Sequence, residues 1–327
     1  MILNKGDMKI LLFGRSGQIG RAILASLPAS AQVIAPDWRD GPAGSNNEAT
    51  NSALLRERWL ADFQDPAQLY ERTLALAPDV IINAAAYTAV DQAEDNQTAA
   101  MQINAHAPAA LAQAAARCGA LLIHYSSDYV FDGSGTRPWR ETDQGRPCNV
   151  YGQSKLAADL AIMGSGCRHL IWRTSWVYAS AGNGFLQTIM RLARTRQTLS
   201  VVNDQIGAPT DARLLAAITV DVLERYGRHP EHLEDGLYHV AAAGQTSWFD
   251  YADRVLARMR ARGVTLALEH LLPVSTQDYA SRARRPLNSR LDTARFLRTF
   301  ARPLPAWQVG VDAAVDRLCE DWMRDQP

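Results

Sequence analysis

The sequence predicts an α/β fold in which a doubly wound parallel sheet is followed by a smaller mixed α/β lobe. In the first half of the chain, short apolar runs alternate with segments of helical periodicity. These runs are apolar on both faces, as strands are when helices cover both sides of a sheet. A glycine-rich turn follows the first run. In the last third the regular alternation ends, which indicates a second, smaller lobe.

The first strand is predicted to begin at Met8, in MKILLFG, and a helix follows it in RSGQIGRAILASL. The second strand, QVIAP, ends at Asp37. We assign no role to residues 1–7. The polar segment 41–58 is longer than most loops of compact α/β units and is expected on the surface, with a short helix near 54–59.

Asp65 and Pro66 predict the start of the next helix, because aspartate caps helices and proline is favoured at their first position. That helix runs to about Leu76. The elements expected after it in this half are a strand at 79–86, an alanine-rich helix at about 98–117 and a buried strand at 120–131 that runs into a loop.

The second half begins with a polar loop at 132–149 and a helix that starts near Tyr151. Thr246 and Ser247 form a cap signal before a late helix. The elements expected in order are a strand at 169–178, helices at 185–196, 211–226 and 247–262, and short strands at 199–202, 237–240 and 264–268.

The composition excludes several classes of protein. Of 327 residues, 47% are hydrophobic, which excludes a disordered chain, and the formal net charge of +0 offers no field for nucleic acid. No apolar stretch reaches the roughly 20 residues of a membrane span, and no signal peptide is recognisable, so we expect a cytoplasmic protein without a membrane partner. The four cysteines lack Cys-x-x-Cys spacing, and His229 and His232 lie in a polar turn, so no metal site is expected.

Gly14, Gly17 and Gly20 lie between the first strand and the first helix. Glycines allow the backbone to approach a pyrophosphate, and a helix N-terminus supplies free N–H groups. The same triplet also suits a plain tight turn, but its position at the first strand–helix turn favours a dinucleotide site. Asp37 would bind the adenosine ribose and favours NADH, whereas Arg39 suits a 2′-phosphate and favours NADPH, so the choice stays open.

Tyr151 and Lys155 are four residues apart and therefore share a face of their predicted helix. A cation near a phenol lowers its pKa, which suits proton transfer near neutrality. Taken alone, such a pair more often belongs to a solvated surface. Ser127 and Asp128 follow a central strand, at the edge of the sheet where ligands bind in open α/β folds. The Ser127 hydroxyl suits a substrate carbonyl oxygen beside Tyr151. Alternatively, Ser127 and Asp128 form a polar strand end that caps the next turn.

Together these motifs resemble the extended short-chain dehydrogenases/reductases and, more narrowly, the dTDP-4-dehydrorhamnose reductase family. The resemblance runs from Met8 to about Asp321. It implies a Rossmann-type sheet, with 8–178 mainly binding the dinucleotide and 179–327 mainly binding the substrate, partly interleaved. The segments that carry it are NAAAYTAVD, HYSSDYVFDG, PCNVYGQSK, RTSWVYA, VVNDQIGAPT, GLYHVAAAG and RRPLNSRLD.

The resemblance implies reduction of the C4 keto group of dTDP-4-dehydro-6-deoxy-L-mannose to dTDP-L-rhamnose by NADPH or NADH, the last step of dTDP-rhamnose biosynthesis. It implies that Tyr151 donates the proton, Lys155 holds the ribose and lowers the tyrosine pKa, and Ser127 polarises the carbonyl. The other residues implied are Gly14, Gly17, Gln18, Ile19, Gly20, Asp37, Arg39, Asp62, Phe63, Ala86, Tyr87 and Thr88 for the cofactor, and Ser127, Asp128 and Trp176 for the substrate.

Arg285 belongs to an arginine-rich stretch, with Arg282, Arg284 and Arg290, whose guanidinium groups suit either a substrate diphosphate or a salt-bridged surface. The chain also departs from the family. Where members with a magnesium-bridged dimer carry glutamates, it has Ala22 and Arg213. We therefore expect no bridging magnesium, and a monomer or a homodimer without a metal bridge. Tyr87 stands where many relatives have histidine.

Two alternatives remain. The regulatory subunit of methionine adenosyltransferase resembles the same family, so a non-catalytic dinucleotide-binding subunit is one of them. The intact set of Ser127, Tyr151 and Lys155 favours an enzyme. A reductase of another nucleotide-4-keto-sugar is the other. Dehydratases of the superfamily carry an Asp-Glu pair after the strand, and Tyr129 after Asp128 disfavours elimination chemistry.

Overall fold

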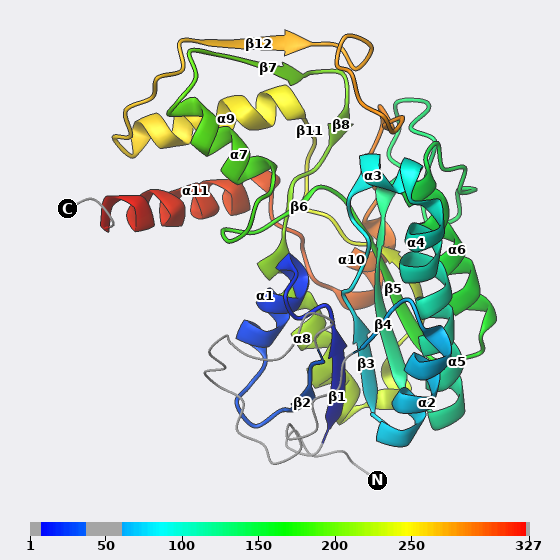
Figure 1. Ribbon diagram of the computed structural model, residues 1–327. Coiled ribbons are helices and arrows are strands. Elements are labelled where there is room, and N and C mark those ends of the chain that lie inside the picture. The colour runs from blue at the N-terminus through cyan, green and yellow to red at the C-terminus, as the bar shows by residue number, and fades with distance from the viewer. Residues whose placement is uncertain (1–7, 37–60, 325–327) are drawn as a thin grey trace. The chain divides into compact units, whose positions relative to one another are not determined.

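The structure is a computed structural model that describes residues 8–36 and 61–324 (Figure 1). Asp37, Arg39 and the segment 41–58 lie outside the described residues, as do residues 1–7. A six-stranded sheet has the order β10-β5-β4-β3-β1-β2. Its strands are β1 (Lys9–Phe13), β2 (Gln32–Ile34), β3 (Val80–Asn83), β4 (Leu121–Ser127), β5 (His169–Thr174) and β10 (Gly236–His239).

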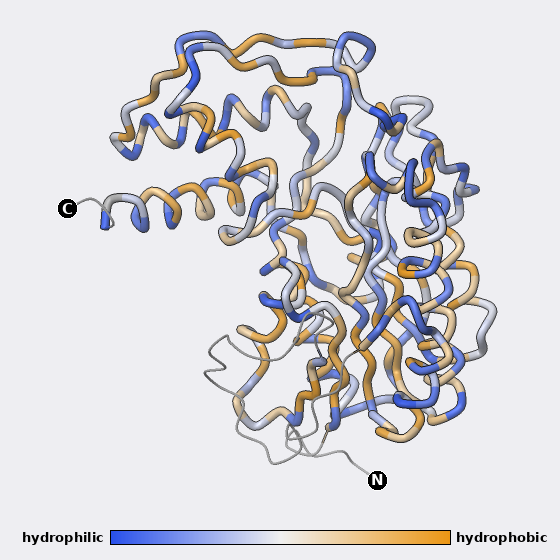
Figure 2. The backbone as a smooth tube through the Cα atoms, viewed as in Figure 1, coloured by the Kyte–Doolittle hydropathy of each residue, from blue (hydrophilic) through white to orange (hydrophobic). Residues whose placement is uncertain are grey.

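The predicted doubly wound sheet is confirmed. The pairs β1–β2, β1–β3 and β3–β4 are parallel, and β3 and β4 are buried along their whole length. Figure 2 shows hydrophobic residues along these strands. Successive residues of a strand face opposite sides. In β4, His124 contacts helix α6 (Val150–Gly164) and Tyr125 contacts helix α8 (Ala212–Arg228), so these helices cover opposite faces.

Local sequence rules account for the helix starts. The side chain of Asp65 accepts a hydrogen bond from Gln68 N, and Pro66 opens helix α2 (Pro66–Leu76). Ser247 caps helix α9 (Trp248–Ala261) in the same way, by accepting from Asp250 N. Both predicted caps are therefore confirmed. Helix α1 (Gln18–Ser26) begins after Gly17 in extended backbone.

The chain forms two compact units. Among the described residues, unit 1 contains those in 8–126, 150–172 and 216–238, and unit 2 contains those in 127–149, 173–215 and 239–324. The separate binding roles expected for 8–178 and 179–327 stay a prediction. Within the described part of the chain, no helix is both long and apolar enough to span a membrane.

Unit 2 contains three two-stranded sheets and a hydrophobic core between helices α7, α9 and α11. Arg254 and Arg258 on α9, and Arg262 directly after it, form salt bridges with α11 at regular spacing. Its elements are β6 (Val177–Tyr178), α7 (Phe185–Ala193), β7 (Thr198–Val202), β8 (Ile206–Gly207), β9 (Thr210–Asp211), β11 (Thr246–Ser247), α9, β12 (His270–Val274), α10 (Ala294–Phe300) and α11 (Trp307–Arg324).

The prediction of a strand at 264–268 is wrong. Its apolar alternation is real, since Leu268 is buried and Val264 and Leu266 pack on the core of unit 2. However, the segment joins no strand ladder among the described residues, and its Leu268 N donates instead to Ala193 O at the end of α7. The strand follows at β12, which pairs with β7. A segment whose side chains alternate between buried and exposed therefore forms a strand only if another strand lies beside it to accept its hydrogen bonds.

Two other predicted elements are interrupted. The strand expected at 169–178 divides into β5 and β6 around Trp176, whose φ of 47° is left-handed. The helix expected at 98–117 consists of α4 (Gln97–Met101), a π-helical turn (Gln102–His106) and α5 (Ala107–Cys118). Pro108 lacks the N–H that a regular α-helix would use there. The sequence analysis also missed α3 (Val90–Asp95), α10 and α11.

The cap on α2 makes a simple test of the fold. Asp65→Ala should lower the free energy of unfolding in urea by about 1 kcal/mol, because Gln68 N loses its partner. Asp65→Ser keeps a side-chain oxygen and should retain most of that stability. Equal stability of the two variants would contradict the assigned cap.

Candidate active site

The glycine turn of unit 1 lies where the strand order of the sheet reverses, between β1 and β3. Gly14 has a φ of 84°, and a Cβ on it would lie 2.5 Å from the carbonyl carbon of Ala84 after β3. A Cβ on Gly20 would lie 2.1 Å from Gly14 O. The turn therefore requires glycine at both positions. It ends at the N-terminus of α1, where the first N–H groups have no partner within the helix.

Asn104 connects the segment after β3 to helix α6. Its side chain donates to Tyr87 O (3.0 Å) and to Ser154 Oγ (3.0 Å), and it accepts from Tyr87 N (2.7 Å). Ser154 Oγ in turn donates to Tyr151 O (2.7 Å). The sequence analysis missed Asn104, which is fully buried in the π-helical turn. The available signal was an asparagine inside an alanine-rich helix, where asparagine is unfavourable.

Tyr151 lies in the first turn of α6, half-buried, and packs with Tyr87 against a small cluster that includes Ala93. The start of the helix is held by Glu94, whose Oε1 accepts from Val150 N at 2.9 Å. A carboxylate at this end also interacts favourably with the positive end of the helix dipole. The position of Tyr151 is thus fixed by contacts from α3 and from the segment after β3.

Lys155 is fully buried, one helical turn after Tyr151. Its Nζ donates to Tyr125 O (2.7 Å) and lies 3.1 Å from His124 Nε2, both in β4. Burial lowers the pKa of Lys155 to about 8, although Asp159 on the same helix raises it. Burial and the lysine hold the pKa of His124 well below its usual range. The predicted Tyr–Lys pair is therefore not a solvated surface pair, because its lysine is inside the protein.

Ser127 and Asp128, at the end of β4, are buried in unit 2. Ser127 Oγ donates to Asp128 Oδ1 (3.0 Å) and accepts from Tyr129 N (3.1 Å), so it caps the turn that follows the strand. Burial raises the pKa of Asp128 to about 6, against hydrogen bonds from Ser289 and Ser127 that lower it. This carboxyl group therefore changes charge close to neutral pH.

Arg285 is the arginine of its stretch that contacts Tyr129, the residue after this pair. Its Nη1 donates to Tyr129 Oη at 3.2 Å. Burial raises the pKa of Tyr129 to about 12, and Arg285 lowers it. Arg282 and Arg284 are exposed, whereas Arg290 donates to Gln245 Oε1. The stretch thus divides between two half-buried residues, Arg285 and Arg290, and two exposed ones, Arg282 and Arg284.

Trp176 forms an aromatic platform in unit 2. Its ring stacks on Trp248 with centroids 3.7 Å apart and planes 12° apart. A Cβ on Gly207 would lie 2.5 Å from the same indole ring. A left-handed backbone at a bulky residue is strained, and such strain often marks functional positions. The sequence analysis missed Trp248 and Gly207, because neither lies near Trp176 in the chain.

The predicted site residues divide between the units. Asp62 is exposed and accepts from Gln64 N, and Phe63 is buried, edge-on to Phe13. The predicted residues in unit 1 are Gly14, Gly17, Gln18, Ile19, Gly20, Asp62, Phe63, Ala86, Tyr87, Thr88, Tyr151 and Lys155, and those in unit 2 are Ser127, Asp128, Trp176 and Arg285.

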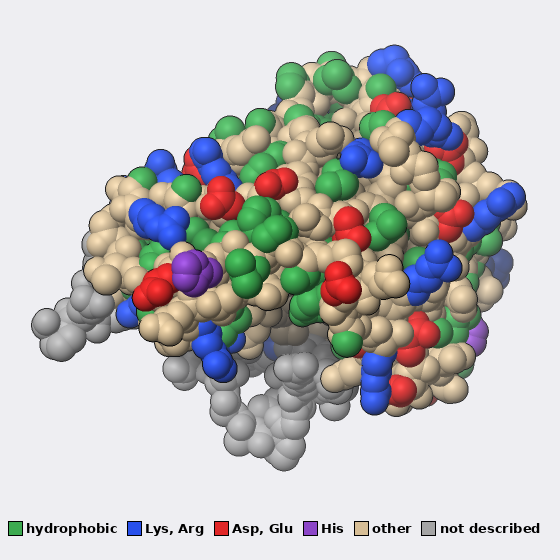
Figure 3. Space-filling model, turned by 90° about the horizontal axis from the view of Figure 1, so that it is seen from above, with side chains coloured by type: hydrophobic (Ala, Val, Ile, Leu, Met, Phe, Trp, Pro, Cys, Tyr) green, Lys and Arg blue, Asp and Glu red, His purple; other side chains and the backbone are tan. Residues whose placement is uncertain are grey.

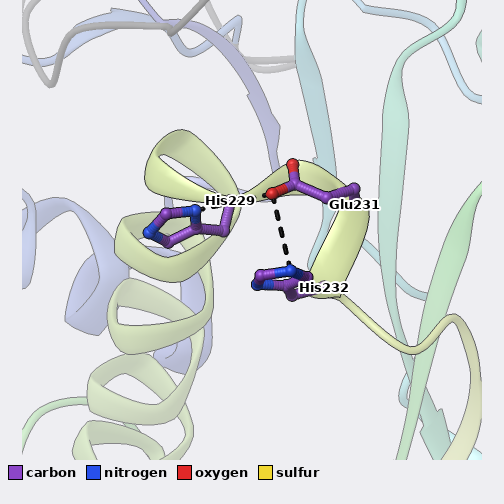
Figure 4. A group of neighbouring side chains, drawn as sticks. All are labelled: His229, Glu231 and His232. Atoms are coloured by element: carbon purple, nitrogen blue, oxygen red, sulfur yellow. Dashed lines mark ion pairs between the residues drawn. The ribbon is translucent and has the colours of Figure 1, made fainter.

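His229, Glu231 and His232 form a second group of polar side chains, after helix α8 (Figure 4). Both histidines approach Glu231 Oε1, at 3.5 Å and 3.7 Å. All three are exposed, as expected for a polar turn. On the described part of the face in Figure 3, acidic, basic and hydrophobic side chains are interspersed.

The chain is similar to proteins of known family along most of its length. The family model described as RmlD substrate binding domain matches residues 8–320. The dTDP-4-dehydrorhamnose reductase of Salmonella typhimurium strain LT2 is 46% identical over 304 residues, 93% of this chain and 96% of that protein. The Escherichia coli K12 protein of the same name is 44% identical over 311 residues, 95% of this chain and 98% of that one.

Solved structures agree with the sequence comparisons. The dTDP-4-dehydrorhamnose reductase of Bacillus anthracis, crystallised in complex with NADP, superposes with a TM-score of 0.80 at 29% identity. The alignment covers 95% of this chain and 99% of the Bacillus chain. The Clostridium acetobutylicum structure of that name gives a TM-score of 0.81 at 30% identity, with the same coverage.

Asp128 predicts a pH dependence of stability. Its folded pKa of about 6 lies above its ordinary 3.8, so the folded protein binds more protons between these values and loses stability as the pH rises through this window. Asp128→Asn removes this loss. Relative to the native protein, it should gain on the order of 1–3 kcal/mol of unfolding free energy between about pH 4.5 and pH 7.5. Parallel urea-unfolding profiles of the two proteins would contradict the raised pKa.

Proposed function

The chain belongs to the dTDP-4-dehydrorhamnose reductase family, and on that premise we propose that it reduces the C4 keto group of dTDP-4-dehydro-6-deoxy-L-mannose to dTDP-L-rhamnose. It is an NAD(P)H-dependent oxidoreductase of the last step of dTDP-L-rhamnose biosynthesis. The observation that carries the proposal is the buried Lys155 amine one helical turn from Tyr151, in the unit that also holds the glycine turn.

The glycine turn fits a dinucleotide pyrophosphate. Side chains at Gly14 and Gly20 would collide with the backbone, so glycine keeps the turn tight beside the N-terminus of α1, where free N–H groups favour an anion. We propose that the N–H groups of Gln18 and Ile19 bind the pyrophosphate and that Ala86, Tyr87 and Thr88 line the nicotinamide side. A bound nicotinamide dinucleotide supplies the hydride. The sequence leaves the choice of cofactor open, because Asp37 favours NADH and Arg39 favours NADPH.

The proton comes from this chain. As hydride arrives at C4, the carbonyl oxygen gains negative charge and must be protonated. We propose that Tyr151 Oη donates this proton and that the Lys155 ammonium, held by Tyr125 O, stabilises the phenolate that remains. Ser127 Oγ would donate a hydrogen bond to the same carbonyl oxygen, in exchange for its present bond to Asp128. Proton uptake by Tyr151 from solvent then restores the enzyme.

The substrate contacts proposed for unit 2 follow from its chemistry. We propose that the Trp176 ring, which stacks on Trp248 and lies close to Gly207, makes an apolar contact with a sugar or base ring. Arg285 offers a guanidinium that suits one charge of a diphosphate. Asp128 can accept a hydrogen bond from a sugar hydroxyl when it is ionised, which its pKa of about 6 permits at neutral pH.

A magnesium ion that bridges two copies does not fit the residues present. Ala22 offers no oxygen ligand. Arg213 is a cation and forms a salt bridge with Asp211. We therefore propose that any homodimer forms without such a metal bridge.

The turnover assay described below also distinguishes two other functions. A non-catalytic regulatory subunit would need no buried lysine beside a tyrosine, and the burial of Lys155 argues against it. Another nucleotide-4-keto-sugar would use the same Tyr151 chemistry with different contacts to Trp176 and Arg285.

Turnover by purified protein tests the proposed reaction. With the dTDP-4-keto sugar and NADPH or NADH supplied separately, the native protein should oxidise at least one cofactor. Tyr151→Phe should reduce kcat by about 10²–10⁴-fold while binding the dinucleotide normally, because only the proton donor is lost. Tyr279→Phe, at an exposed tyrosine, is the matched control and should keep full activity. Full activity of Tyr151→Phe would refute the assigned proton donor.

The glycine turn makes a second test. In Gly20→Ala the new Cβ would lie 2.1 Å from Gly14 O, so the turn must move and dinucleotide affinity should fall at least about tenfold. Gly164→Ala, also in a helix but with no atom within 4 Å of the new Cβ, should leave the affinity unchanged. Dissociation constants from fluorescence titration compare the two. An unaltered affinity of Gly20→Ala would show that the dinucleotide binds elsewhere.

A further inference from the structure

Three buried side chains form a hydrogen-bonded chain that ends on the Lys155 amine. Asn83 is the last residue of β3, His124 lies in the neighbouring β4, and Lys155 lies on α6, which packs over them. Asn83 Nδ2 is 3.1 Å from His124 Nδ1, and His124 Nε2 is 3.1 Å from Lys155 Nζ. Each of the three residues is at most 1% exposed, so these groups must satisfy one another rather than water.

The backbone fixes the direction of this chain at one end. Ala85 N–H lies 3.2 Å from Asn83 Oδ1, and a backbone N–H can only donate. The amide oxygen of Asn83 therefore faces Ala85, and its NH₂ group donates to His124 Nδ1. Burial keeps His124 neutral, and a neutral imidazole carries one proton. That proton must be on Nε2, which faces Lys155 Nζ.

The Lys155 amine must then accept a hydrogen bond. An ammonium group has three donors and no acceptor, whereas a neutral amine has one lone pair. Neutral Lys155 can accept from His124 Nε2–H while donating to Tyr125 O. Burial favours the neutral amine, whereas Asp159 on the same helix favours the ammonium, as does the carbonyl acceptor Tyr125 O. The neutral amine and the ammonium are therefore close in free energy near pH 8, the pKa of Lys155.

We infer that Asn83 and His124 are positioning residues that couple the charge of Lys155 to the tautomer of His124. When Lys155 takes up a proton from solvent, the proton of His124 moves from Nε2 to Nδ1, so that Nε2 accepts from the ammonium. Asn83 then turns its amide oxygen toward Nδ1 and releases Ala85 N–H. The net change is one proton gained by Lys155, with His124 neutral throughout.

This coupling reaches the glycine turn. A Cβ on Gly14 would lie 2.6 Å from Ala85 N, so the segment that orients Asn83 packs directly against the proposed dinucleotide site. A ligand that shifts this segment would alter the hydrogen bond that selects the neutral amine. The inference rests on the proposed function only in giving Lys155 a catalytic role, because the tautomer itself can be observed without turnover.

Histidine-ring ¹⁵N NMR of the cofactor-free protein tests the inference directly. The His124 signals are identified by their absence from His124→Gln. At about pH 9.5 the Nε2–H tautomer is expected, and at about pH 6 the Nδ1–H tautomer, with a midpoint near the Lys155 pKa of about 8. A single tautomer over the whole range, or an imidazolium ring, would overturn the coupling even if the reductase assay succeeds.

Asn83→Asp tests the direction of the chain. A carboxylate can only accept, so it should hold His124 as the Nδ1–H tautomer at every pH and favour the Lys155 ammonium. The alkaline limb of kcat against pH, which reports loss of the ammonium, should then move upward by about one pH unit. A variant with an unchanged limb and a lower kcat would reduce Asn83 to a structural residue.

His124→Gln supplies a second variant in case Asn83→Asp does not fold. Its amide can present either nitrogen or oxygen to Lys155, so it keeps a hydrogen bond but removes the fixed direction. We expect most of kcat to remain and the alkaline limb to move upward, whereas His124→Leu, which offers no hydrogen bond, should lose at least about tenfold in kcat. Equal loss in both variants, with no shift of the limb, would contradict the inference.

Discussion

The burial of the Lys155 amine fixes how helix α6 packs on the sheet of unit 1. A lysine taken out of water must find partners inside the protein or lose its charge. Here Tyr125 O and His124 provide them, and both lie in β4. These contacts fix the rotation of α6 about its own axis relative to the sheet. They therefore also set the position of Tyr151, which lies one turn earlier on the helix.

The neighbouring polar contacts have the same effect. Asn104 holds the Tyr87 segment to Ser154 on α6, and Glu94 holds the first turn of that helix. The π-helical turn that places Asn104 inside the protein interrupts an otherwise regular helix. Such turns are frequent at functional positions. These bonds join the segment after β3, where the glycine turn packs, to the helix that carries the proton donor.

The sequence predicts those parts of the fold and site that depend on local rules. The caps at Asp65 and Ser247, the glycine turn and the spacing of Tyr151 and Lys155 follow from a few adjacent residues. It could not predict contacts between distant segments, such as Asn104 with Ser154 or the Trp248 ring on Trp176, since no local pattern identifies the partner residue. The strand expected at 264–268 failed for the same reason, because strand pairing depends on a partner elsewhere in the chain.

Delivery of hydride to C4 of a dTDP-4-keto sugar can be observed directly. The most direct measurement uses NADPH or NADH deuterated at the transferable position and follows the product by mass spectrometry and NMR. We expect dTDP-L-rhamnose with a single deuterium at C4. Product without deuterium at that carbon, or no product despite binding of both ligands, would contradict this expectation.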